Sequence, residues 1–247
     1  MLNAIERKAF IPEEASSVPV RADSILIVAA TRWEAAPLVR RLRLKAVSPN
    51  RFEGPVGDGS VVLLQTGVGA ARVSEALGAL ENQGFSLLSS TGYAGALQTD
   101  LRAGAVIVDM PVAGDSASLR SAAASVGLDL QFGRIAHSDR ELTHPDEKIA
   151  LGKETGACAV DMETAALRDW ARPFQIPVCA VRIISDAADE RLPGGFPADD
   201  NLGAQCAYAL RHPFELPLLT RLAFRQWHAM PRYSLLLAKF LSSLGEP

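Results

Sequence analysis

Apolar residues occur along this chain mainly in short uninterrupted runs that alternate with longer segments of mixed character. The runs are rich in valine, isoleucine and leucine, as expected of strands buried on both faces of a sheet. They predict strands at residues 24–30, 61–65, 86–90, 105–108, 128–135, 157–160 and 178–184. Between them, the pattern predicts helices at about residues 32–44, 70–83, 146–155 and 162–171.

The alternation of strands and helices determines the predicted fold class. Such a sequence builds a mostly parallel sheet covered by helices on both faces. We therefore expect an α/β fold with three layers, an α/β/α sandwich. Residues 23–204 are predicted to form the main domain, after a flexible leader at residues 1–22. Residues 205–247 are predicted to form basic amphipathic C-terminal helices packed on the same domain.

The C-terminal segment differs from the rest of the chain in charge. Between Gln205 and Leu244 there are five basic residues and one acidic residue, so the local charge is 5 − 1 = +4, whereas the whole chain carries −3. Apolar residues recur here with helical spacing, for example Leu218, Leu219 and Leu222. A basic amphipathic helix can lie on an anionic membrane surface. It can equally pack on its own domain or on a neighbouring subunit, so both interpretations stay open.

Composition narrows the setting in which the chain acts. Hydrophobic residues make up 48% and charged residues 21%, as in an ordinary protein with a sizeable core. The net charge of −3 gives no general attraction to nucleic acid. Cys158, Cys179 and Cys206 form no CxxC pair, which favours free thiols in a reducing compartment. No signal peptide and no membrane span are expected, so the predicted location is the cytoplasm, with membrane-surface association as a variant.

Three acidic residues are predicted to lie at one edge of the sheet. Glu34 follows the first strand, Glu163 the strand at 157–160, and Asp186 the strand at 178–184. Ligands of α/β sheets bind at the carboxyl ends of the strands, so these side chains are candidates for one acid–base and cation-stabilising cluster. The alternatives are structural: Asp186 can cap a following helix, and Glu163 can complement a helix dipole.

Four motifs give the chain a family resemblance. The segments Val160-Asp-Met-Glu-Thr-Ala-Ala166 and Val181-Arg-Ile-Ile-Ser-Asp-Ala-Ala-Asp189 resemble two signatures of the purine nucleoside phosphorylase and methylthioadenosine/adenosylhomocysteine nucleosidase superfamily. Gln65-Thr-Gly-Val-Gly69 resembles its first glycine turn and Ser90-Thr-Gly-Tyr-Ala-Gly-Ala96 its second. The order and spacing of the four agree over about residues 24–190. The resemblance implies a mixed sheet and a homo-oligomeric enzyme, a phosphorylase or nucleosidase, that cleaves the N-glycosidic bond of a purine nucleoside.

The resemblance also implies a role for each matching residue. Asp186 would face the purine N7, Glu163 would hold the ribose hydroxyls, and Glu34 would position the attacking water. These roles suit the chemistry, because a carboxylate stabilises an oxocarbenium-like sugar and an acid must protonate the departing purine. Neither a metal nor a cofactor is implied. The other implied substrate-binding residues are Met162, which would pack against the sugar, and Gly92, Tyr93, Ala94, Gly95 and Ser185.

Water and phosphate both stay open as the nucleophile. Phosphorylases that resemble the bacterial purine enzyme carry arginines at the positions of Glu34 and Ser90, which favours hydrolysis here. Guanidinium and hydroxyl groups near helix N-termini can nevertheless bind phosphate as a co-substrate. The candidates for such contacts are Thr31, Arg32, Gly67, Arg72 and Thr91, although both arginines can equally be solvated surface residues.

The base and the rest of the substrate are less well determined. The nucleosidases stack an aromatic residue on adenine, whereas the matching stretch at residues 135–142 has none and offers only His137 or Arg140. Tyr93 stands where they have a serine. The Asp-Met-Glu segment, the run from Ser185 to Pro193 and the basic apolar tail resemble the hopanoid-associated phosphorylases. That resemblance implies phosphorolysis of an adenosyl-lipid, with hydrolysis of methylthioadenosine or adenosylhomocysteine as the alternative.

Two other classes of protein are alternatives to this enzyme. A Rossmann cofactor-binding domain would account for Gly67 and Gly69, but Arg72 stands where the third glycine belongs and no acid follows about 20 residues later. A purine or lipid sensor on the same fold would bind without turnover. The presence of all three acids argues against a sensor.

Overall fold

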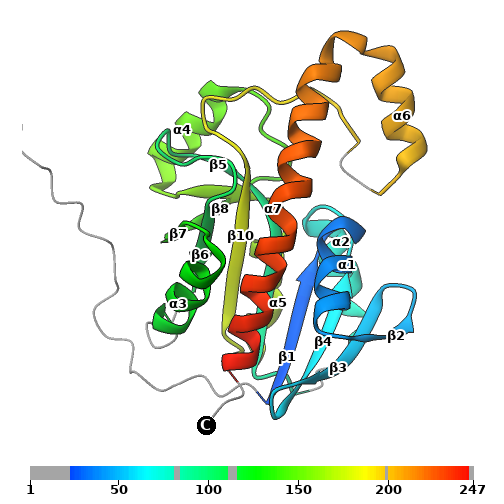
Figure 1. Ribbon diagram of the computed structural model, residues 1–247, viewed down its shortest axis with the longest axis vertical. Helices are drawn as coiled ribbons and strands as arrows, with labels where there is room; N and C mark the ends of the chain where they lie inside the picture. Colours follow the sequence, from blue (N-terminus) through cyan, green and yellow to red (C-terminus); the bar gives the residue numbers. More distant parts are fainter. Residues whose placement is uncertain (1–22, 81–83, 111–115, 198–199, 245–247) are drawn as a thin grey trace, which may run out of the picture.

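The computed structural model describes residues 23–80, 84–110, 116–197 and 200–244 (Figure 1). The predicted leader at residues 1–22 lies outside this part of the chain. The elements in chain order are β1 (Ser24–Ala29), α1 (Arg32–Arg41), β2 (Lys45–Ser48), β3 (Arg51–Val56), β4 (Gly59–Gln65), α2 (Ala70–Gly78), β5 (Leu87–Ala96), β6 (Val106–Asp109), α3 (Ser116–Val126), β7 (Leu130–Phe132), β8 (Ile135–His137), α4 (Pro145–Thr155), β9 (Ala159–Asp161), α5 (Thr164–Ala171), η2 (Arg172–Phe174), β10 (Val178–Asp186), α6 (Leu202–Arg211), η3 (Pro213–Glu215) and α7 (Leu216–Ser243).

One mixed sheet forms the middle layer. Its strand order is β2-β3-β4-β1-β5-β10-β6-β7, and β9 pairs with both β5 and β8. The central strands β4, β1, β5 and β10 are parallel to one another. The strands β3 and β6 run antiparallel to their neighbours β4 and β10. The central strands are buried on both faces, which is why their sequences read as continuous apolar runs.

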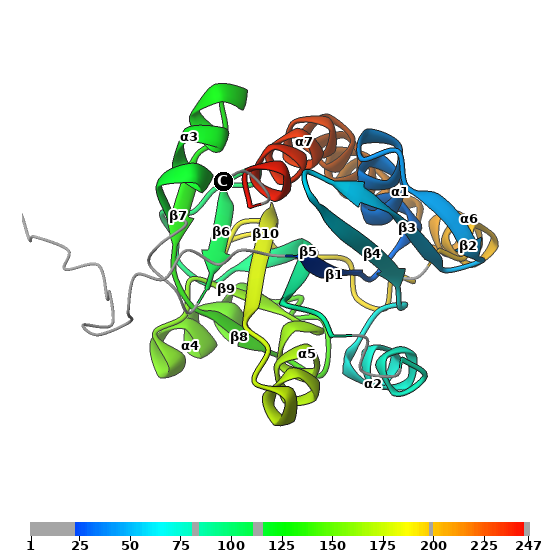
Figure 2. The same cartoon turned by 90° about the horizontal axis from the view of Figure 1, so that it is seen from below.

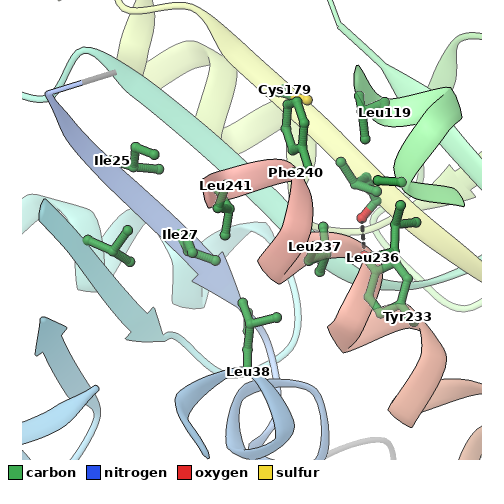
Figure 3. Packing of buried hydrophobic residues seen from close by; sticks show 14 of the residues in the cluster. Ile25, Ile27, Leu38, Leu119, Cys179, Tyr233, Leu236, Leu237, Phe240 and Leu241 are labelled. Carbon is green, nitrogen blue, oxygen red and sulfur yellow. Dashed lines mark hydrogen bonds between the residues drawn. The ribbon is translucent and has the colours of Figure 1, made fainter. Parts of the chain in front are cut away.

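Helices cover both faces of this sheet. Figure 2 shows α1, α3 and α7 on one face and α2, α4 and α5 on the other. On the first face, Phe240 and Leu241 of α7 belong to the same buried cluster as Ile25 and Ile27 of β1 (Figure 3). The predicted three-layer α/β/α fold with a mixed sheet is therefore confirmed.

Several boundaries differ from the sequence-based expectation. The expected strand at 128–135 is two strands, β7 and β8, which pair with different neighbours. The segment Ser90–Ala96, expected as a glycine turn, makes up most of the long strand β5. The hairpin of β2 and β3 was missed because β2 is exposed throughout and β3 contains Gly54 and Pro55, so neither shows an apolar strand pattern. Helix α3 was also missed, because its alanine- and serine-rich sequence has a weak apolar pattern.

Helix α7 consists of two halves with different surroundings. From Met230 onward, one side is buried in the core, including Tyr233, Leu237 and Phe240. Between Leu216 and Ala229 no residue is fully buried, and large apolar side chains such as Phe224 and Trp227 are exposed. Figure 1 shows this first half, together with α6, extending beyond the carboxyl ends of the strands. Among the described residues, no helix is both long and apolar enough to cross a membrane.

Candidate active site

Glu34 is held in place by the start of helix α1. Its Oε2 accepts hydrogen bonds from the backbone N of Thr31 at 2.8 Å and from the Thr31 hydroxyl at 3.1 Å. The Thr31 hydroxyl in turn caps the helix at the backbone N of Glu34. This is a capping box, a local pattern in which a threonine is followed three residues later by a glutamate. Oε1 accepts a further bond from the backbone N of Tyr93 at 2.9 Å, so the carboxylate links α1 to β5.

Glu163 lies in a buried charge cluster with Arg182. Its Oε1 accepts a hydrogen bond from the backbone N of Gly69 at 2.8 Å, and its Oε2 is 3.4 Å from Nη2 of Arg182. Arg182, only 1% exposed, also pairs with Asp161 at 2.7 Å. Burial raises the pKa of Glu163, and the charge of Arg182 opposes this rise. Glu163 is the N-cap residue of α5, but its side chain makes no capping hydrogen bond. Asp161 accepts the bonds from the backbone N of Glu163 and of Thr164 instead.

Asp186 forms a second buried site with a lysine. Its Oδ2 is 2.5 Å from Nζ of Lys148, and its Oδ1 accepts a hydrogen bond from the Ser185 hydroxyl at 2.5 Å. Burial raises the pKa of Asp186, and the neighbouring ammonium lowers it. The next described helix begins only at Leu202, so the alternative that Asp186 caps a helix is wrong.

Strand β5 lies beside two acidic sites, one with Glu34 and Glu163 and one with Asp186, and sets the distance between them. A Cβ at Gly92 would lie 2.2 Å from Oε1 of Glu34, and one at Gly95 would lie 3.3 Å from Oδ2 of Asp186. Gly95 follows Gly92 by three positions along the strand, which is a distance of roughly 10 Å. The resemblance implied that both glycines let the backbone approach the ligand, whereas in the structure they make room for acidic side chains. Gly92 also has a φ of +138°, which other residues rarely adopt.

Glu163 reaches this site by a different route from the one expected. The prediction placed it at the carboxyl end of a parallel strand, but β9 runs antiparallel to β5, with Val160 opposite Gly95. Because of this reversal, the chain beyond β9 runs back toward Gly92 rather than away from it. Met162 lies on the way, and its Cε would be 3.9 Å from a Cβ at Gly69.

The predicted phosphate contacts are not assembled as free donors. The hydroxyl of Thr31 is bonded to Glu34, and that of Thr91 to the Tyr233 hydroxyl at 2.7 Å. The backbone N of Gly67 donates to the Ala30 carbonyl at 2.9 Å. Arg72 has an exposed side chain paired with Glu75, and Arg32 is also exposed. Local bonds therefore engage Thr31, Thr91 and the backbone N of Gly67, whereas the side chains of Arg32 and Arg72 lie at the surface. A phosphate site at these five residues stays a prediction.

Two of the predicted substrate residues line a cavity on the α7 face of the sheet. This cavity has a volume of about 410 Å³ and takes in Tyr93 and Ser185, together with Arg225 and Arg232 of α7. None of the three acids contributes to its walls. The Tyr93 hydroxyl donates a hydrogen bond to the Gln226 carbonyl at 3.2 Å, which ties β5 to the same helix. The cavity is adjacent to the acidic sites but is not formed by them.

Sequence reasoning missed three side chains that organise the site: Arg182, Lys148 and Tyr233. Arg182 lies inside the Val181–Asp189 motif. A charged residue within an otherwise apolar strand could have indicated its role in the site. The Tyr233 hydroxyl donates to the Val181 carbonyl and accepts from the backbone N of Gly92 at 3.3 Å. Nothing in the local sequence of Tyr233 or Lys148 indicates these contacts, because their partners are far away in the chain.

Comparison with known proteins places this arrangement in a family. A model described as the phosphorylase superfamily matches residues 113–210. The 5′-methylthioadenosine/S-adenosylhomocysteine nucleosidase of Actinobacillus succinogenes is 31% identical over 169 residues, which cover 56% of this chain and 73% of the relative. The chain belongs to the phosphorylase superfamily. The prediction of an enzyme of the nucleoside phosphorylase or nucleosidase class is confirmed by this membership.

Solved structures show the phosphorylase-superfamily fold over most of the chain. The nucleosidase of the same description from Campylobacter jejuni aligns with a TM-score of 0.68 at 17% identity, covering 89% of this chain and 99% of that one. A futalosine hydrolase mutant of Helicobacter pylori aligns with a TM-score of 0.66 at 18% identity, covering 90% and 99%. At these identities the likeness concerns the fold.

Proposed function

We propose that this enzyme hydrolyses the N-glycosidic bond of a purine nucleoside. The observation that carries the proposal is the placement of two acidic sites along one short stretch of β5. At the Gly92 end, Glu34 accepts a bond from the backbone N of Tyr93, and Glu163 pairs with Arg182. Asp186 lies at the Gly95 end. The separation of roughly 10 Å along the strand suits a ribose and a purine lying end to end.

Each acid then has a task that its surroundings support. Asp186 is buried with a raised pKa, as required of an acid that donates a proton to the purine N7 near neutral pH. Glu163 is fixed by Gly69 and Arg182, and it holds the ribose hydroxyls while Met162 packs against the sugar. The backbone at residues 93–95 and the Ser185 hydroxyl complete the binding surface. As the C1′–N9 bond breaks, the carboxylates stabilise the positive charge on the sugar.

The surroundings of Glu34 favour water over phosphate as the nucleophile. A carboxylate offers about four acceptor positions, and three of them are occupied by Thr31 and Tyr93. The remaining position can orient one water molecule toward the sugar. The Thr91 hydroxyl and the backbone N of Gly67 add support, because both are already engaged within the protein rather than available to a phosphate. The nucleosidase relative makes methylthioadenosine-type nucleosides the first substrates to try.

The test measures purine release from methylthioadenosine and adenosine with and without phosphate, and identifies the sugar product. Release of free sugar at equal rates in both buffers is the expected result. Release that needs phosphate and yields a ribose 1-phosphate would overturn hydrolysis. Light scattering on the same preparation tests the accompanying proposal, taken from the family resemblance, that the enzyme is a homo-oligomer.

A second candidate is phosphorolysis of a lipid-linked adenosyl substrate, as in the hopanoid-associated phosphorylases. One observation favours a lipid-linked substrate: α6, η3 and the first half of α7, which extend beyond the strand ends, expose large apolar side chains. Phe214 is 98% exposed, Leu210 84% and Trp227 71%. Arg211 and Arg221 accompany them on the same segment. Aromatic and basic residues on a projecting helix are typical of binding to an anionic membrane surface, and such binding would bring the site to a substrate held in the bilayer.

This membrane proposal predicts a loss of vesicle binding in a defined variant. The enzyme is expected to sediment with phosphatidylglycerol vesicles, and Phe214→Ser with Trp227→Ser is expected to weaken binding at least about tenfold, since each large apolar side chain contributes about 1.5–3 kcal/mol when buried. Phe174→Ser is the matched control, because Phe174 is an exposed aromatic residue elsewhere on the surface. Equal sedimentation of the double variant and the wild type would refute membrane contact by this segment.

A further inference from the structure

Lys148 of α4 is a buried lysine whose ammonium group has every donor engaged. The residue is 1% exposed. Its Nζ lies 2.5 Å from Oδ2 of Asp186, 2.7 Å from the Glu190 carbonyl and 3.2 Å from the Ala187 carbonyl. An ammonium has three N–H donors, so all three are used. Burial of a lysine is costly unless it is paired in this way.

Lys148 is the nearest counterion of Asp186. Among the described residues, the Lys148 ammonium is the group that forms an ion pair with the Asp186 carboxylate. Two other charged groups influence Asp186, namely Glu190 on the segment after β10 and Glu141 on the segment before α4. Glu190 already pairs with Arg221 and Arg225 of α7. Burial and the charge of Asp186 raise the pKa of Glu141 to about 6, and Lys148 acts in the opposite direction.

We propose that Lys148 is a positioning residue that acts through Asp186, because its ammonium holds Oδ2 and so confines the transferable proton to Oδ1. The inference rests on the proposed function. Oδ1 is the oxygen that faces the Ser185 hydroxyl. In the reaction the proton leaves Oδ1 for the purine N7, and the electron pair of the C1′–N9 bond passes to the purine. The water oriented by Glu34 forms the new C1′–O bond and gives a proton to that carboxylate. The Asp186 carboxylate left behind is stabilised by Lys148, which keeps its own proton throughout.

The test compares Lys148→Met, Lys148→Gln and Lys148→Arg with the wild type. Without the ammonium, only the Ser185 hydroxyl still offsets the burial of Asp186, so the pKa of Asp186 rises further. Because the acid must be protonated to act, the rate falls as pH rises through that pKa. The falling limb of the kcat profile should therefore move up by about one pH unit or more in the neutral variants, and the maximal kcat should drop at least about tenfold because the acid is weaker. KM should change little.

Two matched variants separate this effect from damage to the fold. Lys148→Arg keeps the charge and should keep the wild-type limb. Lys153→Met removes an exposed lysine of the same helix and should change nothing. If the neutral variants lose rate while the limb stays at the wild-type pH, Lys148 only tethers the segment after β10 and the proposal is overturned.

A second measurement needs no turnover. Carbon-13 NMR titration of labelled aspartate carboxyls, with the Asp186 signal assigned by its loss in Asp186→Asn, gives the pKa of Asp186 directly. A raised pKa in Lys148→Gln supports the proposal, and an unchanged one overturns it, even if Lys148→Met does not fold. If the wild type releases no purine from any nucleoside, the proposed function fails, whereas the titration still decides the charge coupling.

Discussion

Replacing Asp186 by asparagine is expected to lower kcat for purine release by about 10²- to 10⁴-fold, which is the usual contribution of a general acid. Asparagine has nearly the same shape and its amide oxygen can still accept a hydrogen bond from Lys148. It cannot give a proton to the purine N7. KM should therefore stay near the wild-type value, because binding of the nucleoside does not depend on that proton.

The control for this variant is Asp189→Asn. Asp189 lies three residues further along, its side chain is 62% exposed, and it is 3.9 Å from Arg102. Its replacement should leave the kinetics unchanged. Steady-state rates of both variants, with far-UV circular dichroism to confirm folding, make the comparison. Near-wild-type turnover by folded Asp186→Asn would remove Asp186 from the role of proton donor.

Replacing Arg182 by leucine is expected to lower the free energy of unfolding by about 3–5 kcal/mol, the range seen when one partner of a buried ion pair is removed. Arg182 is 1% exposed and neutralises both Asp161 and Glu163. Without it, two carboxylates are buried close together with no counterion. The loss should shrink as pH falls, because protonation of either carboxylate removes the uncompensated charge.

Urea unfolding at several pH values measures this loss. Arg172→Leu is the matched control, because Arg172 pairs with Asp169 at the surface and such pairs contribute at most about 1 kcal/mol. Adding Asp161→Asn and Glu163→Gln to Arg182→Leu should recover part of the lost stability. A loss in Arg182→Leu no larger than that of the control, independent of pH, would show that the cluster does not depend on this charge.

The local pattern of apolar residues predicted some strands of this chain accurately and missed others. The strands β1, β4, β6 and β10 were predicted within about two residues at nearly every end, because strands buried on both faces need continuous apolar runs. The hairpin of β2 and β3 was missed because an exposed edge strand tolerates polar residues. The stretch Ser90–Ala96 was misjudged because its two glycines indicate a turn. In the structure, Glu34 and Asp186 need the space that those glycines leave.

The same distinction between local pattern and tertiary contacts applies to the candidate site. By itself, the sequence determined the fold class and identified the three acids as candidates, because both depend on patterns of residues that are neighbours in the chain. The capping box of Thr31 and Glu34 is equally local, although it was not predicted. Only the tertiary structure decided which acids meet. The antiparallel course of β9 turns Glu163 back toward Arg182, and α4 brings Lys148 to Asp186 from 38 positions away. Such pairings depend on strand direction and helix packing, and a buried charge is stable only where these supply its partner.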